Sequence, residues 1–162
     1  MPLPEPLRAT LLMVAEAMAP ARQPWWIVSS AAVALHGADP GQIGDVDVLF
    51  DPSDAPPLLK ALGLSAEPGQ GSDQFRSAVF ARWTDPPLPV EFFADFHLHE
   101  AGEWRPVLLV TRDFVAVDGA ALPVPSREEL RALLQRFGRA KDHARAAALS
   151  ASGRFPSRSG SV

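Results

Sequence analysis

The sequence predicts a mixed α/β (α+β) domain, a mixed β-sheet flanked by helices with a helical pair at the C-terminal end. Short aromatic and β-branched runs alternate with segments whose apolar residues recur at helical spacing. The 17 prolines among 162 residues favour many short elements over a bundle of long helices. Apolar and charged fractions of 47% and 21% are those of a globular chain. We expect one domain over residues 1–149 and a flexible Ser/Gly/Arg-rich tail over 150–162.

The first part of the chain is expected to alternate helix, strand, helix and strand. Ser29 and Ser30 precede an alanine-rich run, and a serine hydroxyl there would cap a helix by accepting a hydrogen bond from a free N–H of its first turn. Gly37 closes that run. The expected elements are a helix over 7–18, a strand over 25–28, a helix over 31–36, a loop over 38–44 and a strand over 45–50.

The second part of the chain is expected to contain most of the strands and the C-terminal helices. Ser126 and Glu129 form a capping-box pattern for a helix to about Phe137, and Gly138 separates it from a last helix over 139–149. The other expected elements are a helix over 57–64, a Gly-rich turn over 67–72, strands over 75–83 and 90–96, a loop over 97–105, a short strand over 107–110, and a hairpin of 114–117 with 120–124.

The charge distribution and the composition exclude several functional classes. The net charge is −4, with +5 on residues 127–162 and −9 on the remainder. This charge distribution is not that of a protein that binds duplex DNA through its overall positive charge. The absence of cysteine excludes disulfides, thiolate zinc sites and a cysteine nucleophile. No segment is long and apolar enough to cross a bilayer, so we expect no membrane partner and a cytoplasmic protein.

Three acidic residues on two predicted strands form the strongest candidate site. Period-two alternation places Asp45 and Asp47 on one face of a strand, where their mutual repulsion favours a cation between them. Glu91 becomes a third carboxylate if its strand pairs beside the first, with Asp95 as a weaker candidate. Oxygen donors of this kind suit Mg²⁺, or Mn²⁺, together with substrate phosphates. Without a ligand, the same residues would form the polar face of a half-exposed strand.

Hydroxyl and basic groups flank these acids in the sequence. Ser29 and Ser30 at a helix N-terminus would offer hydroxyls and N–H groups to phosphate oxygens, or would only cap the helix. Arg139 and Lys141 form either a solvated helix start paired with Asp142 or a basic contact to a triphosphate or an acceptor.

The order of these motifs resembles a known superfamily. The run WIVSSAAVALHG at 26–37, followed by GDVDVL at 44–49, resembles the signature of the DNA polymerase β-like nucleotidyltransferases. The ending PSREEL at 125–130 and GRAKD at 138–142 is similar to that of small bacterial members, including the AbiEii-type and MNT-type toxin–antitoxin groups. The resemblance covers residues 24–149.

The resemblance implies a nucleotidyltransferase fold and a two-metal transfer of a nucleoside monophosphate from an NTP, ATP among them, to an acceptor hydroxyl. It implies that Asp45, Asp47 and Glu91 ligate the metals, with Glu91 also helping to deprotonate the acceptor. The acceptor class (RNA, protein or small molecule) stays open. Because the chain is short, a partner protein or a homodimer would supply the acceptor-recognition surface.

The sequence departs from the superfamily pattern close to the predicted phosphate side. Ser29 replaces a glycine, and GQIG at 41–44 lacks the arginine and threonine that relatives often carry before the first aspartate. Leu134 replaces a lysine. These departures favour a second hypothesis, a catalytically degenerate fold that acts as a binding or regulatory module, for example in a toxin–antitoxin pair.

Overall fold

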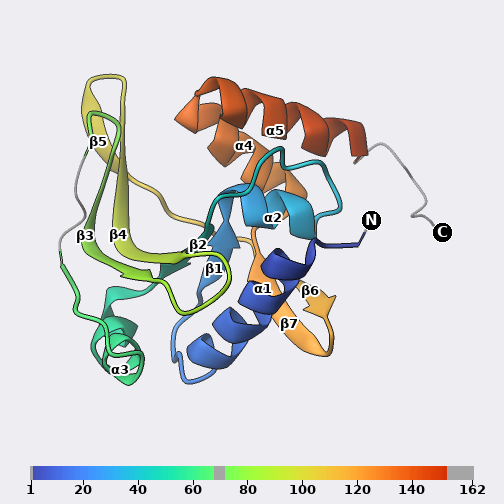
Figure 1. Ribbon diagram of the computed structural model, residues 1–162. Coiled ribbons are helices and arrows are strands. Elements are labelled where there is room, and N and C mark those ends of the chain that lie inside the picture. Colours follow the sequence, from blue (N-terminus) through green and yellow to red (C-terminus); the bar gives the residue numbers. More distant parts are fainter. Residues whose placement is uncertain (1, 68–71, 153–162) are drawn as a thin grey trace.

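The computed structural model describes residues 2–67 and 72–152, which form a mixed sheet with helices around it (Figure 1). The helices are α1 (Glu5–Met18), α2 (Ser29–Leu35), α3 (Ala55–Ala61), α4 (Arg127–Phe137) and α5 (Ala140–Ser152), with a 3₁₀ turn, η1, at Pro52–Asp54. The strands are β1 (Trp26–Val28), β2 (Val46–Phe50), β3 (Phe75–Trp83), β4 (Val90–Glu100), β5 (Glu103–Pro106), β6 (Asp113–Val117) and β7 (Ala120–Val124).

The main sheet has the strand order β1-β2-β4-β3, and β5 pairs with the far end of β4. Among the described strands, only β2 and β4 run parallel, because α3 and β3 lie between them in the chain and bring it back to the end of the sheet at which β2 begins. The other pairs are antiparallel, and β6 with β7 forms a separate hairpin. The sheet is therefore mixed, as the sequence predicts.

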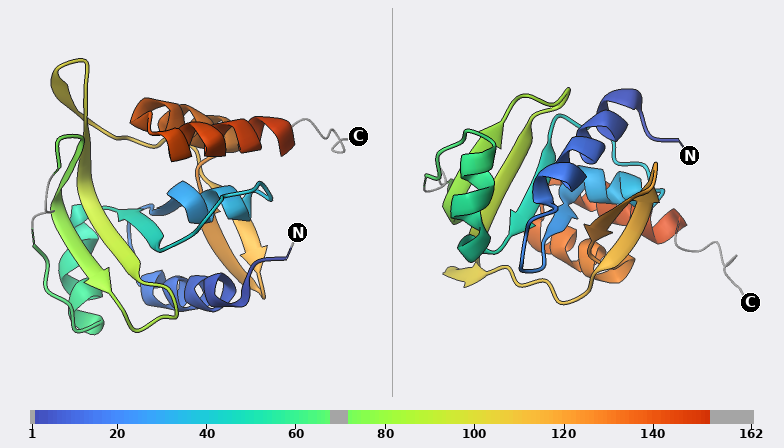
Figure 2. Two further views of the ribbon diagram at one scale, coloured as in Figure 1. Left: turned by 45° about the horizontal axis from the view of Figure 1, so that its top comes forward. Right: turned by 90° about the horizontal axis from the view of Figure 1, so that it is seen from below.

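Alternation along the central strands gives the sheet one apolar and one polar face. Val46 and Val48 of β2 and Phe92 of β4 are buried in the core, whereas Asp47 and Glu91 point to the opposite face. Helix α1 adds Leu7, Leu11 and other apolar residues to the core. Figure 2 shows α1 and α3 on one side of the sheet and the α4–α5 pair on the other.

The C-terminal helical pair is fixed to the domain through α2 and the segment before α4. Ser126 caps α4, since its hydroxyl accepts a hydrogen bond from Glu129 N at 3.1 Å. Gly138 ends α4 in the left-handed conformation, as its position predicts. The Glu129 carboxylate does not return to the cap. It accepts hydrogen bonds from the backbone N–H groups of Val110 and Thr111, both at 2.9 Å.

Two predictions for the 97–110 region are wrong. The loop expected over 97–105 is an extension of β4 followed by β5, joined at Ala101 and Gly102, which both have positive φ. Fully buried Leu98 holds this hairpin against the core, a tertiary contact that local propensity does not show. The short strand expected over 107–110 is irregular backbone: the N–H of Val107 donates to the Phe96 carbonyl, and the N–H of Val110 donates to the Glu129 carboxylate instead of to a strand.

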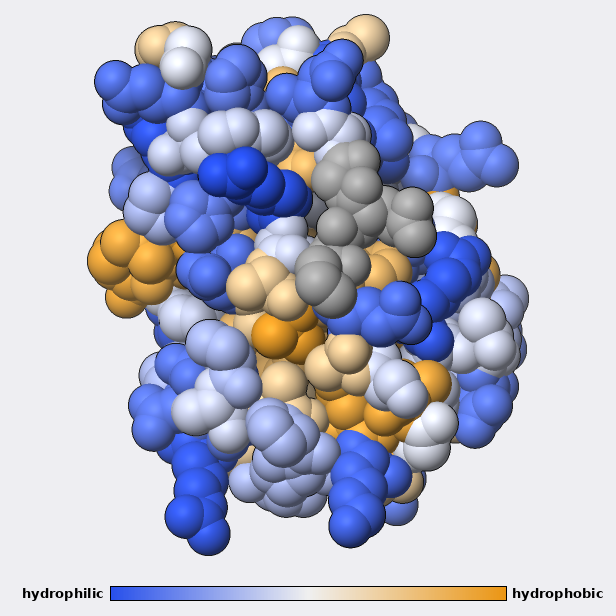
Figure 3. All heavy atoms as spheres, turned by 90° about the vertical axis from the view of Figure 1, so that its left-hand side faces the viewer, coloured by the Kyte–Doolittle hydropathy of each residue, from blue (hydrophilic) through white to orange (hydrophobic). Residues whose placement is uncertain are grey.

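Other boundaries differ by a few residues. The helix expected over 57–64 begins at Ala55 and ends at Ala61, and the strand expected over 90–96 continues to Glu100. Helix α5 runs to Ser152, and the rest of the predicted tail lies outside the described residues, as do residues 68–71 of the predicted 67–72 turn. None of the described helices has the length and apolar character needed to span a bilayer. Figure 3 views the side of β3 and α3, where hydrophobic side chains gather between hydrophilic ones.

Candidate functional site

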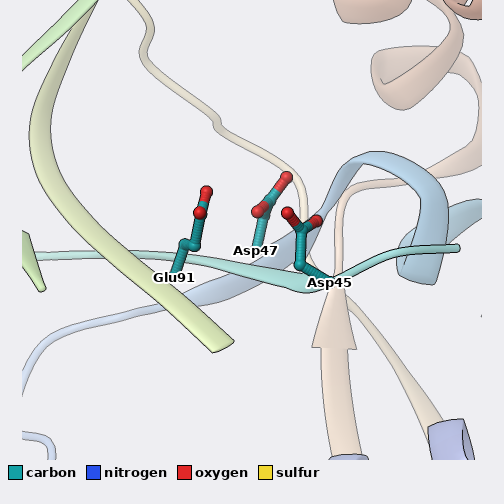
Figure 4. A group of neighbouring side chains, drawn as sticks. All are labelled: Asp45, Asp47 and Glu91. Carbon is teal, nitrogen blue, oxygen red and sulfur yellow. The ribbon is translucent and has the colours of Figure 1, made fainter. Parts of the chain in front are cut away.

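The three predicted acidic residues meet on the polar face of the sheet. Asp45 directly precedes β2, Asp47 lies on β2, and Glu91 lies on β4 directly opposite Asp47 in the parallel register. One carboxylate oxygen of each residue lies within 4.8 Å of the others. Figure 4 shows the three side chains pointing to the same side of the sheet. The structure thus brings together the residues that the sequence selects, while Asp95 lies elsewhere on β4 and is exposed.

Asp47 is the most perturbed group of this cluster. Its Oδ1 is shielded from solvent and has no hydrogen-bond partner among the described residues. Burial raises the pKa of Asp47 to about 8, and the neighbouring Asp45 and Glu91 charges add to this effect. The side chain of Ser29 and the positive charge of Arg139 act in the opposite direction. A shielded carboxylate oxygen without a hydrogen-bond partner is costly, so the site favours either a proton or a cation at Asp47 Oδ1.

Glu91 links the acidic cluster to β3. Its Oε2 accepts a hydrogen bond at 2.6 Å from Arg82, which lies opposite it on β3. Partial burial and then the Asp45 charge raise the pKa of Glu91, while the Arg82 charge and hydrogen bond lower it. Arg82 therefore orients Glu91 and compensates part of the negative charge of the cluster.

Ser29 and Ser30 begin α2 and line the cavity beside the acids, but the predicted N-cap is wrong. Val28 occupies the N-cap position, and no side chain in the described part of the chain caps this helix. Ser29 has φ 60°, in the left-handed region that favours glycine. The superfamily signature carries a glycine at this position, and the serine keeps the backbone conformation at the cost of strain. Ser30 is buried.

Arg139 and Lys141 both border the cavity, in different environments. Arg139 donates to the buried Asp142 carboxylate at 2.5 and 3.0 Å, and its guanidinium lies 5.0 Å from the Phe75 ring centroid. Lys141 is exposed. A third basic residue, Arg145, escapes the sequence analysis although it follows Lys141 by one helical turn. It donates to the Pro40 carbonyl at 2.8 Å, which ties α5 to the loop before Asp45.

These residues surround a cavity of about 460 Å³ with two chemically different halves. One half contains α2, the loop before β2 and α5, with hydroxyl and basic groups. The other half is formed by β3, β4 and the end of α4, and its aromatic lining residues are Phe75, Phe80, Phe93, Phe96 and Phe137. Sequence reasoning missed this aromatic half, although alternation from Glu91 already places Phe93 on the same face.

Comparisons with known proteins identify the fold. By sequence, the chain matches no family model and no curated protein. A structure from Thermotoga maritima described as a nucleotidyltransferase is similar over 95% of this chain and 97% of its own, with a TM-score of 0.70 and 22% identity. This chain has the nucleotidyltransferase fold.

Two antibiotic-related structures have the same fold at lower similarity. The lincosamide antibiotic adenylyltransferase LnuA in its lincomycin-bound form has a TM-score of 0.58 and 12% identity, covering 91% of this chain and 97% of its own. The antibiotic-resistance factor ANT(2'')-Ia also has a TM-score of 0.58 and 12% identity, with coverages of 90% and 83%. The predicted resemblance to nucleotidyltransferases is confirmed for the fold, whereas the AbiEii/MNT-type subgroup stays a prediction.

Proposed function

We propose that this protein transfers a nucleoside monophosphate from an NTP to an acceptor hydroxyl, using divalent cations held by Asp45, Asp47 and Glu91. The observation that carries the proposal is the register of β2 and β4, which brings three carboxylates within 4.8 Å in a nucleotidyltransferase fold. The alternative, a polar strand face exposed to solvent, does not explain why Asp47 Oδ1 is shielded from solvent without a hydrogen-bond partner among the described residues.

The residues present fit a hard divalent cation. All three offer carboxylate oxygens, the donors that Mg²⁺ and Mn²⁺ prefer, and Asp47 Oδ1 has a free coordination position. When bound, the cation neutralises the triphosphate charge and lowers the pKa of the acceptor hydroxyl. We propose Mg²⁺ as the cation, with Mn²⁺ as a substitute.

The hydroxyl and basic half of the cavity is suited to the triphosphate. Ser29, Ser30 and Lys141 line this half, and together they offer hydroxyl and ammonium donors to phosphate oxygens. Arg139 is fixed by its pair with Asp142, so that its charge is already oriented before a substrate binds. These residues hold the nucleotide and keep its α-phosphate near the carboxylates.

In the reaction, the acceptor oxygen bonds to the α-phosphorus as the bond to the β-phosphate bridging oxygen breaks, and pyrophosphate leaves. Glu91 accepts the proton of the acceptor hydroxyl. Its raised pKa and its position at the β3 side of the cluster suit it to this role. Arg82 keeps the Glu91 carboxylate oriented through its hydrogen bond to Oε2. The acceptor could be an RNA, a protein or a small molecule. One protein of this fold, LnuA, has a small molecule, lincomycin, bound.

Isothermal titration calorimetry tests the proposal. The wild type should bind an NTP in the presence of Mg²⁺ and lose most of that affinity in EDTA. The double variant Asp45→Ala/Asp47→Ala should not respond to Mg²⁺. The absence of metal-dependent binding by the wild type would contradict the enzymatic function.

A second candidate is a catalytically degenerate fold that binds or regulates a partner, for example in a toxin–antitoxin pair. It is favoured by the strained Ser29, whose Cβ stands where the signature has glycine. Restoring glycine distinguishes the two functions. If Ser29→Gly acquires metal-dependent NTP binding that the wild type lacks, the native chain is the degenerate form. If both bind equally, Ser29 is compatible with the enzyme.

A further inference from the structure

The aromatic half of the cavity contains apolar surface that the fold does not use. Phe80 and Phe93 are half-buried and line the cavity, and neither belongs to the hydrophobic core nor packs against it among the described residues. They lie opposite one another on β3 and β4. Burying such rings in the core would stabilise the fold, so their place on the cavity wall points to a ligand.

A second pair of rings extends the same wall. Phe75 and Phe96 stack with ring centroids 5.7 Å apart and an interplanar angle of 24°, and the Phe96 ring lies 4.9 Å from that of Phe93. Asp95, between Phe93 and Phe96, has φ 54° and interrupts the regular alternation of β4. The rings of Phe93 and Phe96 therefore line the same cavity, although a spacing of three residues on a regular strand would place them on opposite faces.

The wall lies on the acceptor side of the proposed reaction. Across the sheet from β1 to β3, Asp47 comes first, then Glu91, then the β3 residues. Phe93 follows Glu91 by two residues on the same face of β4, so it stands beside the carboxylate of the acidic cluster that lies nearest to β3. Ser29 and Ser30 directly follow β1, which pairs with β2 on the side away from β4.

The charges around the wall restrict the acceptor further. Arg76 of β3 lies at the aromatic half, and its guanidinium lies 4.2 Å from the Trp104 ring centroid. The carboxylates lining the cavity are Asp45, Asp47 and Glu91, all assigned to the cation. Arg76 has no carboxylate partner among the described residues, so its charge would repel a polycationic acceptor and would not repel a neutral or anionic one.

Resting on the proposed function, we infer that the acceptor is a neutral or anionic molecule whose reacting hydroxyl is carried on or beside a flat aromatic group. The ring would lie against Phe80 and Phe93, with its hydroxyl toward Glu91. An anionic substituent would face Arg76. This chemistry disfavours polycationic sugars as acceptors.

A matched pair of small probes tests the inference. The anionic 4-hydroxyphenylacetate and the cationic tyramine share a phenol and differ in charge. Each is titrated into protein saturated with Mg²⁺ and a non-hydrolysable NTP analogue, with the ring signals of ¹³C-labelled phenylalanine followed by NMR. We expect 4-hydroxyphenylacetate to shift the Phe80 and Phe93 signals and to bind about tenfold more tightly than tyramine.

Three variants locate the binding. Phe93→Ala should weaken 4-hydroxyphenylacetate about tenfold while leaving the Mg²⁺–nucleotide affinity within about twofold. Phe114→Ala is the matched control, because Phe114 is 58% exposed on β6 and does not line the cavity. It should change neither affinity. Arg76→Glu should reverse the preference in favour of tyramine.

The outcomes separate this inference from the proposed function. If calorimetry on the same samples shows no metal-dependent nucleotide binding, the proposed function fails and the inference fails with it. If the nucleotide binds but neither probe does, or if Phe93→Ala has no effect on the probe, only the inference is overturned. The inference is also overturned if the nucleotide analogue itself perturbs Phe80 and Phe93 and excludes the probe, since the wall would then hold the base.

Discussion

Replacing Asp47 by asparagine should stabilise the metal-free protein while abolishing its response to metal. The substitution keeps the size and shape of the side chain and removes its ionisation. It removes the negative charge beside Asp45 and Glu91 and provides an N–H group that can donate to their carboxylate oxygens. In metal-free protein, the wild-type residue must instead keep a proton or bear an unpaired charge, because its Oδ1 is buried without a partner.

The size of the effect follows from the pKa of Asp47. Its ordinary value is 3.8, while burial and the neighbouring acids raise it to about 8 in the folded protein. Between these values the folded state binds more protons than the unfolded state, so the free energy of unfolding falls as the pH rises. The slope from this group is at most about 1.4 kcal/mol per pH unit. We therefore expect Asp47→Asn to exceed the wild type by about 2–4 kcal/mol at pH 7 in EDTA.

Urea denaturation followed by tryptophan fluorescence measures this difference at several pH values from 5 to 8. The control Asp85→Asn removes an exposed carboxyl and should change stability by less than about 0.5 kcal/mol. Saturating Mn²⁺ should stabilise the wild type, whereas Asp47→Asn should gain little. If Asp47→Asn is less stable than the wild type in EDTA at pH 7, or if its stability changes with pH as steeply as that of the wild type, the Asp47 charge does not destabilise the metal-free protein.

Three other predictions concern the site and its support. Ser29→Gly should be more stable than Ser29→Ala by about 1 kcal/mol in thermal denaturation, because alanine keeps a side chain at φ 60°; equal stabilities would contradict strain there. Glu129→Ala should cost about 1–3 kcal/mol by freeing the backbone N–H groups of 110–111, whereas the exposed Glu128→Ala should cost under about 0.5 kcal/mol; similar losses would show that these bonds contribute little. Mn²⁺ affinity, measured by electron paramagnetic resonance, should rise up to about tenfold per pH unit toward pH 8, because binding displaces the Asp47 proton; a flat profile would contradict the raised pKa.

The sequence predicts the parts of the site that depend on local pattern. Alternation alone predicts that Asp45 and Asp47 share one face, and the structure brings their carboxylates together, with Asp45 directly before β2 and Asp47 on it. The position of Glu91 is different, since it depends on which strands are neighbours. Residues 46–50 pair with residues 90–94 across a long stretch of chain, and no local signal specifies that parallel register. The sequence therefore predicts Glu91 as the third carboxylate only if its strand pairs beside the strand of Asp47.

The features that sequence reasoning missed arise from tertiary contacts. The helix-like cap pattern at Ser29 does not reveal a positive φ, which the turn from β1 into α2 imposes. The segment 97–105, expected to be a loop, forms a hairpin, because Leu98 is buried in the core. The aromatic wall needs the pairing of Phe80 with Phe93 across two strands before it can be recognised as one surface.

The most direct test of the account is to locate a metal ion at the three carboxylates. Crystals of the wild type grown with Mn²⁺ and a non-hydrolysable NTP analogue should show an anomalous difference peak about 2 Å from oxygens of Asp45, Asp47 and Glu91, next to the triphosphate. The Asp45→Ala/Asp47→Ala variant under the same conditions should lack it. A nucleotide bound with no manganese at these residues, or manganese only elsewhere, would contradict the account.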